Sequence, residues 1–191
     1  ESEDSWQRLE RALLRLEALT KGGAYKYDEY VPLLKGLGAV VCTSLLSDRT
    51  RLSGTASDVL NSIAPRLGER FDALVPSFVP ALLLLCARQN KVAMTRARKT
   101  LLLIAKHCRL ASLLPLLREA CRDKAPALRS ASVECAAVLV ETSEKARIHR
   151  RSADVETIVR HGATDSNPEV RQLSKRLFGA YMDKWPERVE L

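Results

Sequence analysis

A short turn between apolar segments recurs along this chain, and it limits the folds that the chain can adopt. In its clearest form, residues 123–129 (DKAPALR), an Asp precedes an Arg by six positions and a helical pattern follows. The arrangement returns at residues 165–171, and residues 90–96 are a weaker copy with Asn in place of Asp. Asp or Asn can accept backbone N–H bonds at a helix start, and Pro126 presets the first-turn φ without removing a needed donor. A turn that recurs between paired helices is typical of a helical solenoid.

Helical periodicity covers most of the remaining sequence, and no convincing alternating strand is present. We expect Ser5 to cap a lone helix over residues 6–20, with Arg8, Glu10, Arg11, Arg15 and Glu17 facing water. Four helical hairpins are predicted to follow, over residues 27–67, 71–108, 110–144 and 147–184. In the second hairpin, Pro76 and Pro80 predict a kink or a late helix start.

The spacing of the turns identifies the class of repeat. The turn markers Asp48, Asn90, Asp123 and Asp165 lie 42, 33 and 42 residues apart, the range of HEAT or armadillo repeats. We therefore predict an all-α, HEAT-repeat helical solenoid that forms a single domain over residues 1–191. Because the chain starts abruptly at Glu1, we expect it to be a fragment excised from a larger multidomain protein.

The composition agrees with a fold of packed helices, and the cysteines indicate the cellular compartment. Hydrophobic residues make up 46% of the chain but aromatic residues only 5%, which suits helix–helix packing better than sheets. The five cysteines are dispersed without a C-x-x-C pair, so we expect reduced thiols in a cytosolic or nuclear protein. The longest apolar run, residues 79–87, is too short to span a membrane and contains Pro80.

Charge and motifs favour a binding protein over an enzyme. The formal net charge of +8 favours an acidic partner, namely nucleic acid, an anionic membrane surface or an acidic protein, without choosing among them. His107, His149 and His161 lack the spacing of metal ligands, so no metal site is predicted. The sequence has no Gly-rich phosphate loop, nucleophile elbow or paired-carboxylate motif, so we predict no enzymatic activity and no cofactor.

The turns within the hairpins are the candidate binding surface, because stacked repeats place them along one edge. They carry Arg49, Thr50 and Arg51, then Asn90 and Lys91, then Lys124, then Asn167. Trp6, at the mouth of the first helix, would lie at one end of the same edge. A row of cations with one exposed aromatic anchor suits an extended acidic protein surface.

Several fragments, taken together with their order and spacing, resemble a TOG domain of the CLASP family, most closely the second TOG domain of a fungal member. The fragments are Trp6 with Ala12-Leu13, KGGAYKYDEY (21–30), LGERFD (67–72), NKVAM (90–94), SLLPLLREAC (112–121), APALRS (125–130) and DSNPEVRQLSKR (165–176). The resemblance runs over nearly the whole chain. The chain departs from the family in two ways. Leu9 stands where an Arg is usual, and the helices that the family has before Trp6 and after Trp185 are missing from this sequence.

The resemblance implies a paddle of HEAT repeats whose turn edge binds tubulin, in a protein that stabilises microtubules. The implied partner is the α/β-tubulin dimer or the microtubule, with kinetochore or spindle proteins as further candidates. The implied location is the cytoplasm and the microtubule cytoskeleton, including the spindle, with the nucleus or kinetochore as further sites. The tubulin contacts that it implies are Trp6, Arg49, Thr50, Asn90, Lys91, Lys124, Arg129, Asn167 and Arg171.

Alternatives stay open for single residues and for the whole domain. Trp6 could be a half-buried cap, and Arg129 and Arg171 could form a hydrogen-bond ladder between repeats instead of contacting a partner. The basic run 145–151 could be a solvated connector, or it could touch nucleic acid or an acidic tail. The domain could be a HEAT scaffold that docks another protein, such as a kinetochore or spindle component, with little affinity for tubulin. Nucleic-acid binding is disfavoured because the chain has one exposed aromatic and no groove-reading motif.

Overall fold

The structure, a computed structural model, describes residues 3–188, and over this range it consists of helices joined by turns, with no strand. The prediction of an all-α fold is confirmed over these residues. The chain divides into two compact units, with the boundary between Cys108 and Arg109. We call them unit 1 and unit 2 and describe each by itself.

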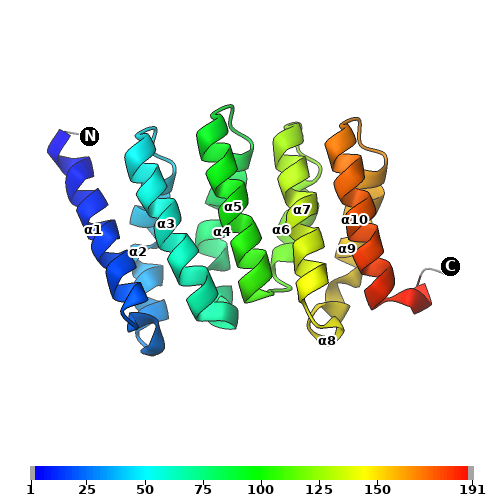
Figure 1. The fold of residues 1–191 in the computed structure, drawn as a ribbon, viewed down its shortest axis with the longest axis horizontal. Helices are drawn as coiled ribbons and strands as arrows, with labels where there is room; N and C mark the ends of the chain where they lie inside the picture. The colour runs from blue at the N-terminus through cyan, green and yellow to red at the C-terminus, as the bar shows by residue number, and fades with distance from the viewer. Residues whose placement is uncertain (1–2, 189–191) are drawn as a thin grey trace. The chain divides into compact units, whose positions relative to one another are not determined.

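Unit 1 consists of a lone helix followed by two helical hairpins (Figure 1). One layer holds α1, α3 and α5, which pack side by side, and α2 and α4 form the layer behind them. The helices of the front layer all begin at the same edge of the unit, at the upper end in Figure 1. The helices are α1 (Glu3–Lys21), α2 (Tyr30–Leu45), α3 (Thr50–Leu67), α4 (Val75–Cys86) and α5 (Lys91–Cys108).

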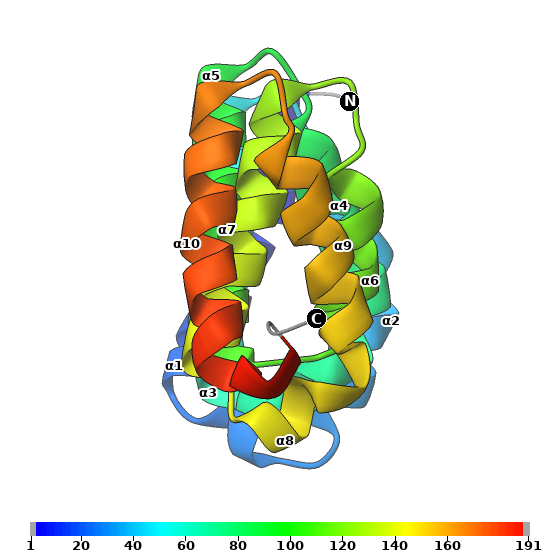
Figure 2. The ribbon, with the colours of Figure 1, turned by 90° about the vertical axis from the view of Figure 1, so that its right-hand side faces the viewer.

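Unit 2 repeats the hairpin twice more, with a short basic connector between the hairpins (Figure 2). In this unit α7 packs against α10 and α6 packs against α9. The helices are α6 (Leu113–Ala120), α7 (Pro126–Thr142), α8 (Lys145–Ile148), α9 (Ser152–Ala163) and α10 (Pro168–Lys184). A 3-10 turn over His149–Arg151 follows α8, so the basic run at 145–151 is helical for its whole length.

Local sequence signals explain where the helices begin and end. Gly68 adopts φ 54°, a conformation that favours glycine, and it ends α3 at the predicted residue. A 3-10 turn over Gly68–Leu74 precedes α4, which begins at Val75 with Pro76 in its first turn. The predicted late start is thus confirmed, because a proline in the first turn lacks only an N–H that would have no partner there.

Two expectations for the first helix are wrong. Helix α1 begins at Glu3, so Ser5 lies inside the helix and does not cap it. No glycine or proline stands before Ser5 to stop the helix from extending upstream. Glu10, expected to face water, is buried, with 5% of the residue exposed. It pairs with Arg51 of α3, a residue too distant in sequence for the helical periodicity to indicate.

The core of each unit is formed by apolar helix faces, and aromatic residues are its largest fully buried side chains. In unit 1, Phe71 and Phe78 are fully buried, with ring centroids 6.4 Å apart. In unit 2, Trp185 is fully buried, lies 5.0 Å from the ring of Tyr181, and donates its indole N–H to His149 Nδ1 at 3.2 Å. Sequence analysis named Trp185 only as the residue after which a further helix is usual in the family, whereas it anchors the end of α10 against the basic connector.

Candidate functional site

The turns of unit 1 come together at one edge, which we call the first rim and define as Trp6, Arg49, Thr50, Asn90 and Lys91. Arg49 lies over Trp6, with its guanidinium carbon 5.1 Å from the ring centroid. Arg96, in the first turns of α5, donates to the Thr50 carbonyl at 2.8 Å. These contacts connect the starts of α1, α3 and α5 (Figure 1). The five unit 1 residues that the resemblance implied as contacts therefore share one edge.

Trp6 carries an unsatisfied polar atom at this rim. The residue is half-buried, and its indole Nε1 is buried without a hydrogen-bond partner among the described residues. A buried donor left unpaired costs about 1–3 kcal/mol. Unpaired buried groups are uncommon in folded proteins, and one of their explanations is a functional role. Trp6 can therefore be a half-buried cap of the first helix and still contact a partner.

Asn90 and Lys91 divide two tasks between them. The Asn90 Oδ1 accepts from the backbone N–H groups of Val92 and Ala93, at 3.1 and 3.2 Å, and so caps α5. Lys91, the first residue of α5, is exposed. The asparagine oxygen therefore holds the turn, and the lysine supplies the accessible charge.

The turns of unit 2 form a second rim, which we define as Lys124, Arg129, Asn167 and Arg171. Arg129 reaches from one turn to the next and makes two parallel bonds to Asp165, Nε to Oδ2 at 2.6 Å and Nη2 to Oδ1 at 2.8 Å. Its Nη1 also donates to the carbonyls of Asp123 and Lys124. Only 13% of the Arg129 side chain is exposed. Arg129 thus has the geometry expected for a hydrogen-bond ladder between repeats. A tubulin contact through Arg129 stays a prediction.

The hydrogen bonds from Arg129 lower the pKa of Asp165 below its ordinary value, because they favour the charged carboxylate. Asp165 Oδ1 also accepts the backbone N–H of Asn167 at 2.8 Å, so the same carboxylate shapes its own turn. The pair is mostly buried, since 7% of the Asp165 side chain is exposed. The turn before α10 thus depends on a charged hydrogen-bond network that joins neighbouring repeats.

The other members of the second rim differ in accessibility. Arg171 donates to the carbonyls of Asp165 and Ser166, at 2.7 and 2.9 Å, and so closes its own turn. The Asn167 Oδ1 caps α10 by accepting from the N–H groups of Glu169 and Val170. Lys124 is exposed, and it is the carbonyl of this residue that Arg129 uses. Lys124 and Arg171 are therefore the accessible cations of this rim, and Lys124 is the one whose side chain does not close its own turn.

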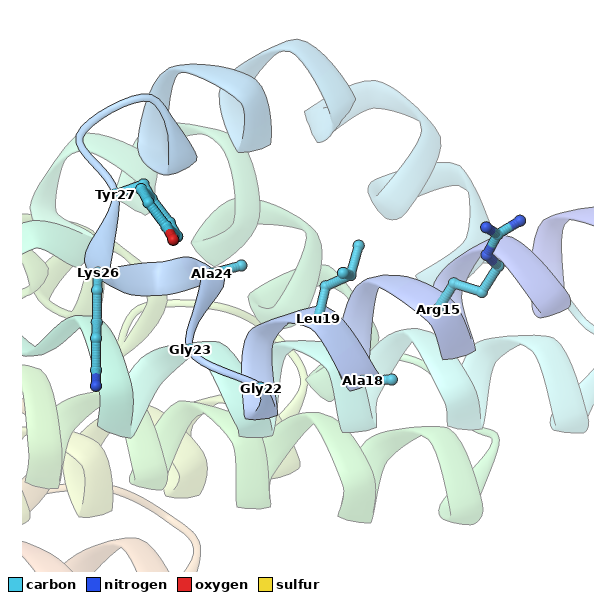
Figure 3. Close-up of a pocket in the computed structure, with 8 residues that line it drawn as sticks. All are labelled: Arg15, Ala18, Leu19, Gly22, Gly23, Ala24, Lys26 and Tyr27. Atoms are coloured by element: carbon cyan, nitrogen blue, oxygen red, sulfur yellow. The ribbon is translucent and has the colours of Figure 1, made fainter.

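A larger hollow lies at the other end of α1, away from the first rim (Figure 3). It has a volume of about 870 Å³, and Leu19 and Tyr27, both more than half exposed, project toward it. Arg15 and Lys26 add positive charge, and its lining contains no carboxylate, thiol or imidazole. Sequence analysis did not anticipate this hollow, because it forms between α1 and the 3-10 turn at Ala24–Lys26.

The remaining reactive residue types are structural or dispersed. Burial raises the pKa of the Cys86 and Cys108 thiols to about 12 and that of Cys121 to about 11, so these thiols stay protonated. No cluster of three or more His, Cys, Asp or Glu residues suited to a metal ion occurs in the part of the chain described. None of the helices in that part is long and apolar enough to cross a bilayer.

Comparison with known proteins gives consistent matches over the chain. The sequence model of the family described as "CLASP N terminal" matches residues 1–190. "Protein stu1" of Aspergillus fumigatus is 30% identical over 205 residues, covering 99% of this chain and 15% of that protein. "CLIP-associated protein" of Arabidopsis thaliana is 28% identical over 188 residues, covering 97% of this chain and 13% of that protein. The chain thus spans about a seventh of the length of these relatives.

Among solved structures, one described as "Crescerin uses a TOG domain array to regulate microtubules in the primary cilium" is similar in fold. The TM-score is 0.68 and the sequence identity 19%, covering 95% of this chain and 75% of that one. This likeness shows a TOG-type helical-repeat fold, in agreement with the HEAT-repeat prediction.

Proposed function

Because this chain belongs to the CLASP N-terminal family, we propose that it is a non-enzymatic tubulin-binding module of a microtubule-stabilising protein. The observation that carries the proposal is the first rim, where three separate helix starts bring Trp6, Arg49 and Lys91 to one edge. The description of the TOG structure, which refers to microtubules, supports the same class of partner. The partner is the α/β-tubulin dimer or the microtubule.

The binding is non-covalent and depends on several weak contacts acting together. An exposed ion pair contributes only about 0–1 kcal/mol, so no single rim cation is sufficient. Several aligned cations and an aromatic anchor give about −8 kcal/mol, which corresponds to micromolar affinity. Tighter attachment to a microtubule then requires several such modules in one protein, through effective concentration. The surplus of positive charge also speeds encounter with an acidic surface.

The proposal extends to the organisation and location of the protein. Residues 1–191 act as one domain, and each rim contacts tubulin. The protein works in the cytoplasm on the microtubule cytoskeleton, including the spindle, and spindle or kinetochore proteins are further partners. Neither nucleic acid nor a membrane takes part in binding.

A charge-reversal experiment tests the rim mechanism. Lys91→Glu and Lys124→Glu each replace an exposed rim cation, and Lys35→Glu on α2 is the matched control because Lys35 is exposed but belongs to neither rim. Co-elution with tubulin dimers at low salt should be retained by the parent chain and the control. Each rim variant should bind about tenfold more weakly, because an attraction becomes a repulsion, and the double variant should not co-elute.

Unchanged binding in the double variant would contradict the rim mechanism. Lysine crosslinking then identifies the surface in use, since Lys91 and Lys124 lie on the rims and Lys145 lies on the basic connector. Crosslinks confined to Lys145, or the absence of tubulin binding by the parent chain, would favour the alternative. That alternative is a HEAT scaffold that docks another protein with little affinity for tubulin.

A further inference from the structure

An ion pair between α1 and the start of α3 holds one arginine in place beside the first rim. The Glu10 side chain is 7% exposed, and its Oε1 accepts from Arg51 Nε at 2.6 Å. Thr55 Oγ1 lies 3.5 Å from the same oxygen. The Arg51 side chain is 74% exposed, and its terminal nitrogens make no hydrogen bond to the described residues. A buried carboxylate thus fixes one side of a guanidinium whose other side is open to solvent.

This arrangement prepares Arg51 to bind an anion. A long cationic side chain normally loses rotamer freedom when it binds, and that loss opposes association. The bond to Glu10 removes much of that freedom before any partner arrives. The free nitrogens of a guanidinium match the two oxygens of a carboxylate, which a lysine ammonium cannot do in the same bidentate way. Arg51 is therefore better organised for carboxylate binding than the exposed Lys91 is.

Arg51 and Trp6 line a small pocket, which we call the notch. Its volume is about 260 Å³, and its lining is Trp6, Gln7, Glu10, Arg11 and Arg51. Arg11 adds a second exposed cation, whereas the charge of Glu10 is balanced by Arg51. Trp6 has an indole N–H that is buried without an acceptor in the described part of the chain. The notch thus combines surplus positive charge, the exposed guanidinium donors of Arg51 and an aromatic wall.

We infer that the notch receives one carboxylate side chain of an acidic protein surface. Arg51 donates to the carboxylate through its terminal nitrogens, and Trp6 forms the wall against which the side chain packs. Glu10 is a positioning residue, which acts through Arg51 and does not touch the partner. The identification of that acidic surface with tubulin rests on the proposed function, whereas the chemistry of the notch does not.

A peptide titration tests the notch without tubulin. The chain has two tryptophans, and Trp185 is fully buried and bonded to His149, so the two indole N–H signals are assigned by a Trp6→Phe variant. Hexaglutamate should shift the Trp6 indole signal in a saturable way, and hexaglutamine should not. Arg51→Ala should abolish the shift. Arg15→Ala should keep it, because Arg15 is an exposed arginine of the same helix α1 that does not line the notch.

Tubulin affinity measures the same contact in the proposed complex. Arg51→Ala should weaken binding about tenfold, the effect expected for a charge-assisted bidentate contact, and Arg15→Ala should leave it unchanged. Arg51→Lys, which keeps a cation near Glu10, should restore only part of the affinity. Glu10→Gln should weaken binding about threefold. It should add nothing in the Arg51→Ala background, whereas a purely structural role of Glu10 would give additive losses.

The two experiments separate the inference from the proposed function. If the parent chain responds to hexaglutamate through Arg51 but does not bind tubulin, the inference about the notch is supported and the proposed function is contradicted. The opposite result is tubulin binding that depends on Lys91 and Lys124 but not on Arg51, with no response of Trp6 to hexaglutamate. This result would contradict the inference about the notch and support the proposed function. A response of equal size in Arg51→Ala and the parent chain would also contradict the inference about the notch.

Discussion

The two rims build the same type of turn with different partners for the arginine. In unit 2, Arg129 reaches forward to the carboxylate of Asp165 in the next turn. In unit 1, Arg96 reaches back to the Thr50 carbonyl, and the position that corresponds to Arg129 in the turn after Asp48 is Gly54. A Cβ at Gly54 would lie 2.9 Å from Arg96 Nη1, so the glycine provides the space in which Arg96 lies. One repeat uses an ion pair where the other uses a neutral carbonyl.

This difference shows how a solenoid can separate stability from recognition. The ion pair in unit 2 is mostly buried, and its loss leaves an uncompensated charge. In unit 1, the Asp is replaced by Asn90, which caps its own helix and pairs with no arginine charge. The turns of unit 1 are therefore joined by the bond from Arg96 to a backbone carbonyl, where unit 2 uses the Arg129–Asp165 pair. We expect the second rim to be the more sensitive to substitution in stability, and the first rim in binding.

The largest effect should come from Arg129→Ala. Removing one partner of a buried ion pair destabilises by about 3–5 kcal/mol, and the partial exposure of this pair places the expected loss near 3 kcal/mol. Urea unfolding of the chain in a Trp6→Phe background measures it, because Trp185 fluorescence then reports unit 2. Lys124→Ala, a neighbouring exposed cation, is the control and should change little. A loss under about 1 kcal/mol for Arg129→Ala would show that the two rims do not differ in this way.

The same ion pair should make the stability of unit 2 depend on acid. Arg129 holds the pKa of Asp165 below its ordinary value of 3.8, so the folded state favours the carboxylate more than the unfolded chain does. The stabilisation is therefore complete above the unfolded pKa and is lost as the pH falls from about 4 through the lower folded pKa. Urea midpoints between pH 6 and pH 3, read from Trp185, should show this loss. The slope should be shallower in Asp165→Asn, and an equal slope would exclude Asp165 as its source.

A smaller loss of stability, equal in the two units, is expected from removing the asparagine caps that both rims share. Asn90 and Asn167 each cap a helix of their own unit through the side-chain oxygen, so Asn→Ala at either position should cost about 1 kcal/mol. Asn→Asp should retain the cap. Hydrogen exchange at the first amides of α5 and α10 measures each unit separately. A clearly larger effect at Asn167 would mean that the cap and the Asp165 network are coupled in unit 2.

The sequence predicts the hairpins well because the signals that define them are local. Pro126, Pro168 and Gly68 act on their own backbone: α7 and α10 begin at the two prolines, and α3 ends just before the glycine, where the predicted hairpin 27–67 ends. The direction in which an arginine reaches is not local. Arg96 and Arg129 follow similar turns, yet their partners depend on whether a neighbouring repeat offers an Asp or the space above a glycine.

The candidate site is predictable in position but not in chemistry. The spacing of the turns predicts that Arg49 and Lys91 share an edge, and within unit 1 they do. The helical pattern gives Glu10 the wrong environment, because its partner Arg51 lies 41 residues away. For the same reason it does not show that Trp185 is buried, since His149 is 36 residues away. Contacts between repeats decide which polar residues are structural, and the periodicity within one helix cannot predict these contacts.

The smallest effect on stability is expected at two exposed lysines that should nevertheless contribute to binding. Lys91 and Lys124 are both exposed, so Lys→Ala at each should change the free energy of unfolding by less than about 0.5 kcal/mol. The same substitutions should weaken tubulin binding and should reduce its dependence on salt, because each removes a screened charge contact. Urea unfolding and co-elution at two salt concentrations measure both quantities on one preparation. Loss of stability together with unchanged tubulin binding at Lys124, with the reverse at Lys91, would mean that recognition belongs to the first rim.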